Sequence, residues 1–231
     1  MIYWAQLLHF YQPPTQSLEV LRRVAEESYR PLLDVLEEHP AARLAVNMNG
    51  VLTEMLVEHG LGDVVERLAA LAERGQVEFT GSGMYHPILP LIPRSECERS
   101  IQENAAVNRR CFGRAWLARG FFPPEMAYGP EIDDPVAAAG HDWMLLSGVA
   151  CPEEWSRSAV YRIRTSRGEL SVLFRDDGAS NAISFRQTDP ERFVAALRRA
   201  APAGTDAYVV TAMDAETFGH HIKGWERDFL A

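Results

Sequence analysis

The stretch Asp206–His221 reads DAYVVTAMDAETFGHH. Its first half contains the apolar, β-prone run Tyr208–Ala212, and the eight residues from Asp214 hold two acids, an aromatic, a glycine and two histidines. A surface turn would account for the polarity, but not for the grouping of side chains that titrate or bind metals. Because residues just past the C-terminal ends of parallel strands meet at one rim, the meaning of this stretch depends on what the other strands end in.

Six further short apolar runs alternate with segments of helical periodicity. With the run above, the strand candidates are Ile2–Leu8, Arg43–Asn47, Val77–Thr80, Gly120–Phe122, Trp143–Ser147, Leu170–Phe174 and Tyr208–Ala212. Alternation of strands and helices predicts parallel strands joined by helical crossovers, and so an α/β fold. No GxGxxG loop follows the first strand, which favours a barrel over a dinucleotide-binding sheet. We expect a single domain over 1–231, with an irregular excursion at about 151–185 that contains a hairpin around Ser166–Gly168.

Several helix ends carry local signals. Helix starts are predicted at the capping box Ser95–Glu98, at Asp134 before Pro135 and at Asp189 before Pro190. Gly75 and Gly140 follow helical stretches, where a left-handed residue closes the last turn.

Composition narrows the class of partner. The 231 residues carry 23 basic and 32 acidic side chains, a net charge of −9, which argues against a nucleic-acid partner or an anionic membrane surface. The cysteines, at 97, 111 and 151, are odd in number and lack CxxC spacing, which argues against a disulfide framework and a structural zinc site. No run approaches the ~20 apolar residues that span a bilayer, and MIYWAQLLHF lacks a basic n-region. A cytoplasmic, reduced protein is expected.

Polar side chains follow four of the predicted strands. The first strand ends in LHFYQPP (Leu8–Pro14), the third in TGSGMYHPILPL (Thr80–Leu91), the fourth in GFFPPEMAYG (Gly120–Gly129) and the last in the opening stretch. The side chains expected to face one cavity are His9, Gln12, His86, Glu125, Asp214, Glu216, His220 and His221. The surrounding aromatics are Tyr11, Tyr85, Phe122, Tyr128 and Phe218. Acids among aromatics suit a sugar, whose ring faces stack while its hydroxyls bind carboxylates and imidazoles.

These stretches resemble the conserved regions of glycoside hydrolase family 57, a retaining, α-glucan-active family with a (β/α)7 barrel. HFYQPP is similar to its first region, GMYHPILPL to its second, FFPPEMAYG to its third and MDAETFGHH to its fourth. LFRDDGASNAISF (Leu173–Phe185) resembles a further segment of the amylopullulanase-like members. The matches run in the family's order from residue 2 to about residue 221. The fold implied is a (β/α)7-type, incomplete TIM-like barrel.

The resemblance implies Glu125 as nucleophile and Asp214 as general acid/base of a glycosidase or 4-α-glucanotransferase acting on α-1,4-linked glucan. A retaining glycosidase needs two carboxyl groups about 5–5.5 Å apart, one charged and one protonated at the same pH. His9 or His86 could hold Glu125 ionised, and desolvation or a nearby carboxylate could hold the proton on Asp214. Glu216 would share the face of Asp214 if the strand continued that far. No metal or cofactor is expected.

The substrate-binding residues expected are His9, Gln12, His86, Tyr128, Arg175, Glu216, His220 and His221, with one of the two adjacent histidines in the site. Arg175 and Asn181 are plausible hydroxyl binders, although each could be a structural hydrogen-bonding residue. Trp143, Trp155 and Trp225 are expected to pack. The partner expected is an oligo- or polysaccharide.

Three features depart from the family pattern. Tyr11-Gln12-Pro13 stands where the family has His-Gln-Pro, and Ser180-Asn181 where it has Ser-Asp. The chain also ends at Ala231, ten residues after the fourth region, without a fifth region or the usual helical segment. We therefore expect an open cleft, completed by self-association or a partner chain.

Two alternatives remain open. One is a weak or inactive homologue that binds glycan. The other is a metal-dependent carbohydrate hydrolase or deacetylase with ligands from His9, His86, Asp214, His220 and His221, although deacetylase-like histidine spacing is absent.

Overall fold

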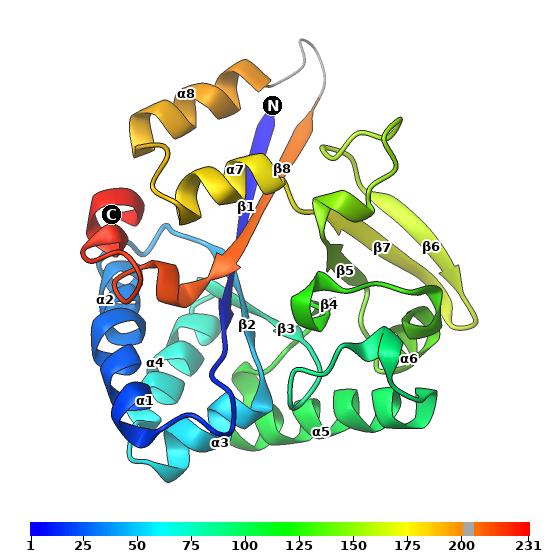
Figure 1. Ribbon diagram of the computed structural model, residues 1–231, viewed down its shortest axis with the longest axis horizontal. Helices are drawn as coiled ribbons and strands as arrows, with labels where there is room; N and C mark the ends of the chain where they lie inside the picture. Colours follow the sequence, from blue (N-terminus) through cyan, green and yellow to red (C-terminus); the bar gives the residue numbers. More distant parts are fainter. Residues whose placement is uncertain (201–205) are drawn as a thin grey trace.

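The computed structural model describes residues 1–200 and 206–231, and it contains one eight-stranded sheet (Figure 1). The strands are β1 (Ile2–Phe10), β2 (Leu44–Met48), β3 (Val77–Gly81), β4 (Gly120–Phe121), β5 (Trp143–Leu146), β6 (Tyr161–Thr165), β7 (Gly168–Phe174) and β8 (Ala207–Asp214). Their order is β6-β7-β5-β4-β3-β2-β1-β8. Neighbours are parallel except β6 and β7, which form the predicted antiparallel hairpin, with Thr165 opposite Gly168.

The sheet curls into an incomplete barrel. Leaving out β6, its strands follow one another in chain order from β1 to β7, with β8 beside β1. The edge of β8 reaches the chain just beyond β7, where Arg175 forms a parallel bridge with Val210 and the Asp176 N–H donates to the Val210 carbonyl at 2.7 Å. No continuous ladder closes the barrel within the described residues. The prediction of a (β/α)7-type, incomplete TIM-like barrel is confirmed.

Helices cover the outside of the sheet (Figure 1). They are α1 (Leu18–Val24), α2 (Arg30–Glu38), α3 (Gly50–Glu58), α4 (Gly62–Glu73), α5 (Arg94–Phe112), α6 (Asp133–Ala138), α7 (Asp177–Ser184) and α8 (Pro190–Ala200). Asp189 caps α8, because its Oδ1 accepts from the Arg192 N–H at 2.8 Å. Gly75 and Gly140, with φ of +72° and +90°, follow α4 and α6 as predicted.

Two predicted helix starts are wrong. Helix α5 already begins at Arg94, because the Pro93 carbonyl accepts from the N–H groups of Glu96 and Cys97, so Ser95 lies inside the first turn. Asp134 lies inside α6, and its carboxylate accepts from the Ser166 N–H of the hairpin at 2.7 Å.

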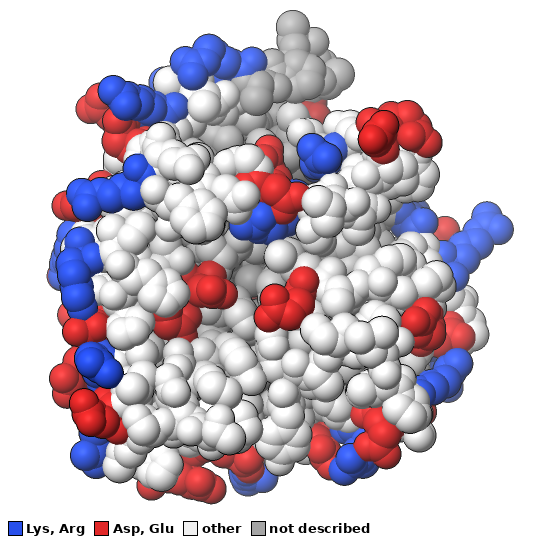
Figure 2. All heavy atoms as spheres, in the orientation of Figure 1, with Lys and Arg blue, Asp and Glu red and all other residues white. Residues whose placement is uncertain are grey.

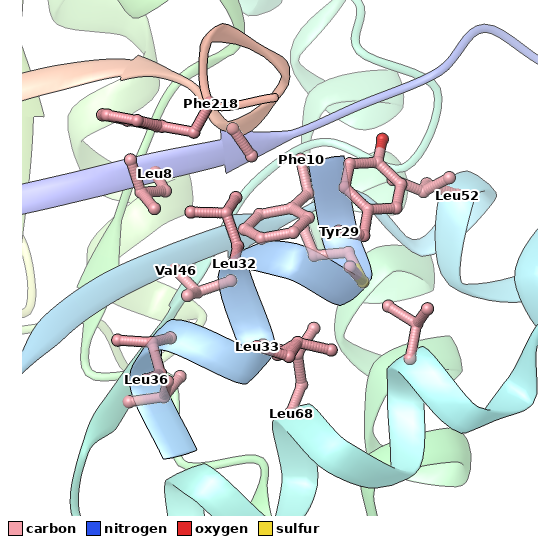
Figure 3. Close-up of a cluster of buried hydrophobic side chains, with 14 of the residues drawn as sticks. Leu8, Phe10, Tyr29, Leu32, Leu33, Leu36, Val46, Leu52, Leu68 and Phe218 are labelled. Carbon is pink, nitrogen blue, oxygen red and sulfur yellow. The ribbon is translucent and has the colours of Figure 1, made fainter. Parts of the chain in front are cut away.

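Successive strand residues point to opposite faces of the sheet, and this divides the core into a part inside the barrel and a part outside it. Leu7 points into the barrel, where it packs with Phe122, Leu145 and Val210. Its neighbours Leu8 and Phe10 point outwards and join the largest apolar cluster, between the sheet and helices α1 to α4 (Figure 3).

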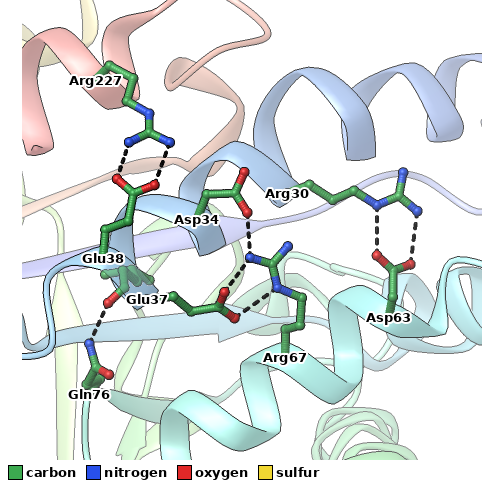
Figure 4. A network of polar contacts seen from close by, with 9 residues as sticks. Arg30, Asp34, Glu37, Glu38, Asp63, Arg67, Gln76 and Arg227 are labelled. Carbon is green, nitrogen blue, oxygen red and sulfur yellow. Dashed lines mark hydrogen bonds and ion pairs between the residues drawn. The ribbon is translucent and has the colours of Figure 1, made fainter.

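Ion pairs fix the position of α2 (Figure 4). Arg30 binds Asp63 of α4 at 2.7 Å, and Arg67 of α4 binds Asp34 at 2.6 Å. Arg227, near the C-terminus, binds Glu38. Such partly exposed pairs contribute about 0–1 kcal/mol each, so their effect is to orient α2 more than to stabilise the fold. No helix in the described ranges is long and apolar enough to cross a membrane.

Candidate active site

A cavity of about 280 Å³ lies at the C-terminal ends of the strands. Figure 2 shows a hollow near the centre of this face, with acidic atoms on both sides of it. The side chains lining the cavity belong to His9, His86, Phe122, Glu125, Met126, Arg175, Asn181, Ser184, Phe185, Ala212, Met213, Asp214, Thr217 and His221. Residues of β1 and β8 therefore converge with residues of the segments that follow β3, β4, β7 and β8, as parallel strands require.

Glu125 lies on a tight turn, Pro124–Met126, directly after β4. Its φ is +57° and that of Met126 is +52°, a left-handed conformation that is uncommon outside glycine. The turn is held by hydrogen bonds from Met126 N to the Pro123 carbonyl and from Ala127 N to the Pro124 carbonyl, at 2.8 and 3.1 Å. Such backbone strain costs on the order of 1–3 kcal/mol per residue and concentrates at functional sites. The Glu125 side chain is 69% exposed.

Asp214 is the last residue of β8 and stands in register with His9 of β1. Its side chain remains open to the cavity, but the protein around it desolvates the carboxylate and raises its pKa. The opposite effect comes from His221 and His86 when they are protonated, and from the charge of Arg175. Asp214 therefore holds its proton to a higher pH than an ordinary aspartate.

Two stacked histidines form one wall. The ring centroids of His9 and His86 are 5.0 Å apart, and Tyr11 stacks on His86 at 4.3 Å. Burial lowers the pKa of each histidine to about 4, so both rings are neutral at pH 7. His9 Nδ1 pairs with Asn47 Oδ1 at 2.7 Å, while the Nε2 atoms of both rings lack a protein partner in the described part of the chain. Both Nε2 atoms are buried, and a buried polar atom without a partner is costly, so each has an unused capacity for a hydrogen bond at the cavity wall.

His86 is also the neighbour of Glu125. Its Nδ1 lies 3.7 Å from Glu125 Oε1, beyond a direct hydrogen bond. Because the ring is neutral, it does not supply the positive charge that would hold Glu125 ionised.

Arg175 bridges to β8 at the open side of the barrel and lines the cavity. Its Nε donates to the Ala212 carbonyl at 2.8 Å, and its guanidinium also binds Asp177 and, at 3.0 Å, Asn181 Oδ1. Asn181 thus binds Arg175 as well as lining the cavity. These contacts hold the guanidinium in the wall that contains Asp214.

Four residues predicted for the site do not line the cavity: Gln12, Glu216, His220 and Tyr128. Strand β8 ends at Asp214 and the chain turns at Ala215–Thr217, so Glu216 does not share the face of Asp214. Glu216 is 5% exposed and accepts hydrogen bonds from Tyr29 and, at 3.0 Å, from Gln12. Its burial raises its pKa to about 7.

His220 points away from the cavity and pairs with Glu27 at 2.6 Å, whereas His221 lines it. Tyr128 lies outside the lining and donates to Asp133 at 3.2 Å. Among the predicted aromatics only Phe122 lines the cavity; Phe218 is in the core, and Tyr85 is exposed.

Sequence reasoning missed Phe185 as a site residue. It follows α7, lines the cavity and is 67% exposed. Its signal was present, because it ends the segment LFRDDGASNAISF.

The metal-dependent alternative has little geometric support. Within residues 1–200 and 206–231, no group of three or more His, Cys, Asp and Glu side chains is placed to hold a metal ion. Of the ligands considered, His9, His86, Asp214 and His221 line the cavity and His220 does not.

A parallel barrel with carboxyl groups and neutral imidazoles around a cavity at its strand ends has the arrangement of a barrel enzyme's active site. The chain belongs to glycosyl hydrolase family 57, whose family model matches residues 4–231.

Relatives of this chain include two curated amylases. The chain is 32% identical to an alpha-amylase of Pyrococcus horikoshii over 139 residues, which make up 60% of this chain and 21% of that protein. It is 27% identical over 244 aligned residues to alpha-amylase 1 of Dictyoglomus thermophilum, an alignment that covers 100% of this chain and 34% of the relative. The crystal structure of 4-alpha-glucanotransferase from Thermococcus litoralis has the same fold, with a TM-score of 0.84 and 24% identity over 96% of this chain. The chain spans 21% to 35% of the length of these three proteins.

Proposed function

We propose that residues 1–231 form one catalytic barrel domain that acts on α-1,4-linked glucan by a retaining mechanism. Glu125 is the nucleophile and Asp214 the general acid/base. The relatives' names, alpha-amylase and 4-alpha-glucanotransferase, support this substrate class.

One observation carries the proposal. Two carboxyl groups from separate strand ends, Glu125 after β4 and Asp214 at the end of β8, line the same cavity in different environments. Glu125 is largely exposed, whereas desolvation raises the pKa of Asp214. Double displacement needs this division between an ionised and a protonated carboxyl group.

In the first step a carboxylate oxygen of Glu125 attacks the anomeric carbon. The glycosidic bond breaks, and Asp214 transfers its proton to the leaving oxygen, which releases one part of the glucan. In the second step the Asp214 carboxylate takes a proton from water or from a hydroxyl of another glucan. That oxygen attacks the anomeric carbon, the bond to Glu125 breaks, and the configuration is retained.

Other cavity residues bind substrate in this proposal. The unpartnered Nε2 atoms of His9 and His86 hydrogen-bond to sugar hydroxyls, and the exposed ring of Phe185 stacks on a sugar face. The Arg175 charge lowers the pKa of Asp214, which limits how far desolvation raises it and lets Asp214 act as a base in the second step.

Incubation with maltoheptaose, with products resolved by mass, tests the proposal. Glu125→Gln and Asp214→Asn should each lose several orders of magnitude in rate, whereas Glu131→Gln, an exposed glutamate outside the cavity, should not. Shorter products alone indicate hydrolysis, and products both shorter and longer indicate transfer. Undiminished turnover by Glu125→Gln would contradict the assignment of the nucleophile. No turnover by the wild type would contradict the proposal as a whole and favour a glycan-binding homologue.

Two finer points belong to the same proposal. The exposed Glu125 side of the cleft would be covered by self-association or a partner chain, which light scattering with and without maltoheptaose tests. The location would be cytoplasmic, in keeping with the free thiols of Cys97, Cys111 and Cys151, and cell fractionation tests it.

A further inference from the structure

An irregular turn joins α1 to α2. Over Ala25–Tyr29 the helix is of the π type, with the Arg30 N–H donating to the Ala25 carbonyl five residues earlier. Pro31, in the first turn of α2, has no N–H to give to the Glu27 carbonyl four residues earlier, so the regular α-helical ladder is interrupted here. Turns of this kind occur frequently at functional sites. We call residues 25–29 the π-turn.

Two neighbouring residues of the π-turn hold the chain directly after Asp214. The Ser28 hydroxyl donates to the Ala215 carbonyl at 2.9 Å. The Tyr29 hydroxyl donates to the Glu216 carboxylate. Both contacts are buried and join residues 187 positions apart. Neither Ser28 nor Tyr29 lines the cavity, so neither is placed to touch substrate.

Glu27 extends the contact to the rest of the segment. Its carboxylate pairs with His220 Nδ1 and Lys223 Nζ, at 2.6 Å each. Gly219 packs directly on the π-turn, since a Cβ on it would lie 1.9 Å from the Glu27 carbonyl oxygen. That carbonyl is the one to which Pro31 cannot donate. The segment 215–223 therefore contacts the π-turn at several points along its length.

The π-turn itself is firmly placed. The Tyr29 ring is fully buried, 5.0 Å from that of Phe10, and Figure 3 shows its hydroxyl oxygen pointing away from the aliphatic side chains. The helix that follows is tied to α4 and to Arg227 by the ion pairs of Figure 4. A fixed support therefore contacts the residues immediately after Asp214.

We propose that the π-turn positions the Asp214 carboxyl group for proton transfer. Ser28 and Tyr29 are positioning residues that act through the Ala215 carbonyl and the Glu216 carboxylate, and so set the direction in which the chain leaves β8. The inference rests on the proposed acid/base role of Asp214.

Two substrates that differ in their leaving group test the inference. A sugar leaving group needs a proton from Asp214, whereas 4-nitrophenolate, a much weaker base, leaves almost without help. We compare kcat/KM, which covers the steps up to the glycosyl-enzyme, for cleavage of maltoheptaose and for the direct release of 4-nitrophenolate from 4-nitrophenyl α-maltoheptaoside. Tyr29→Phe and Ser28→Ala should each lower kcat/KM for maltoheptaose about 10- to 100-fold, and that for the aryl glycoside less than about threefold. The reason is that a displaced Asp214 slows only the reaction whose leaving group needs a proton. Tyr161→Phe, which removes a hydroxyl bond to Ser156 outside the cavity, should change neither. Equal losses on both substrates would overturn the inference.

Hydrogen exchange separates this inference from the proposed function. The His221 N–H donates to the Glu216 carbonyl at 2.8 Å, and the Phe218 N–H to the Ala215 carbonyl at 3.0 Å. Both amides should exchange faster in Tyr29→Phe and Ser28→Ala, and at the wild-type rate in Tyr161→Phe. A wild-type protein that turns over neither substrate contradicts the proposed function, and exchange then decides whether the π-turn holds this segment. Unchanged exchange in both variants overturns the inference.

Discussion

Glu216→Gln should make the protein more stable at alkaline pH. Glu216 is 5% exposed, and burial raises its pKa from 4.5 to about 7. Both of its side-chain donors, Tyr29 and Gln12, bind the same oxygen, Oε1. A glutamine can place its amide oxygen there and keep both bonds, so the substitution removes the titration while preserving the shape.

The direction in which the free energy of unfolding changes with pH follows from the number of protons bound by the folded and unfolded states. The folded protein keeps the Glu216 proton up to about pH 7, while the unfolded chain releases it near 4.5. Over that range the unfolded state binds fewer protons, so the free energy of unfolding falls as pH rises. At 1.36 kcal/mol per pH unit the full effect is about 3 kcal/mol, reached above pH 7 and absent below 4.5.

Urea unfolding of the wild type and Glu216→Gln from pH 4.5 to 8.5 measures this effect. Buried histidines such as His9 and His86, whose pKa values are lowered to about 4, act in the opposite direction as the pH falls. Because they are shared by both proteins, they cancel in the difference. The variant's stability relative to the wild type should rise by up to about 3 kcal/mol across the range. A difference that does not change with pH would refute the assignment of a raised pKa to Glu216.

Three further substitutions test other parts of the structure. Gly219→Ala should destabilise the protein to urea by at least about 1 kcal/mol more than Gly60→Ala, since both have a left-handed φ but only Gly219 has a carbonyl 1.9 Å from the new Cβ. Phe185→Ala should raise KM for maltoheptaose about 3- to 10-fold with kcat nearly unchanged, because a stacking ring contributes uniform binding; a fall in kcat with KM unchanged would argue against that role. Arg175→Met should move the alkaline limb of kcat/KM to higher pH. The charge of Arg175 lowers the pKa of Asp214, so its removal raises that pKa and keeps the acid protonated to higher pH. An unmoved limb would show that another group sets it.

The parallel α/β arrangement could be predicted from local pattern, because parallel strands impose a simple geometry, whereas the (β/α)7 form was implied by the family resemblance. Each β-prone run became a strand, and the C-terminal ends of those strands meet at one rim. Glu125 and Asp214, 89 positions apart in the sequence, were therefore expected to be neighbours, and both line one cavity. The only information needed was which residue ends each strand.

The path of the chain beyond the strand ends could not be predicted in the same way. The expectation for Glu216 depended on an extended chain after Asp214, but the chain turns at Ala215–Thr217. That turn is bound by Ser28 and Tyr29, which are far away in the sequence, and no pattern near residue 216 announces them. Pro31 and Gly219 were visible, but their meeting at the Glu27 carbonyl depends on tertiary structure.

The polar residues of DAETFGHH therefore divide between two tasks. Asp214 and His221 line the cavity, while Glu216 and His220 bind the π-turn behind it. An apolar side chain at 216 would avoid the cost of burying a carboxylate, but it would leave the Tyr29 hydroxyl and the Gln12 amide without their acceptor. Each of those unsatisfied groups would cost about 1–3 kcal/mol, comparable to the ~3 kcal/mol that ionised Glu216 costs above pH 7. Glu216 is thus a tolerable residue for stability and, if the π-turn positions Asp214, a useful one for catalysis.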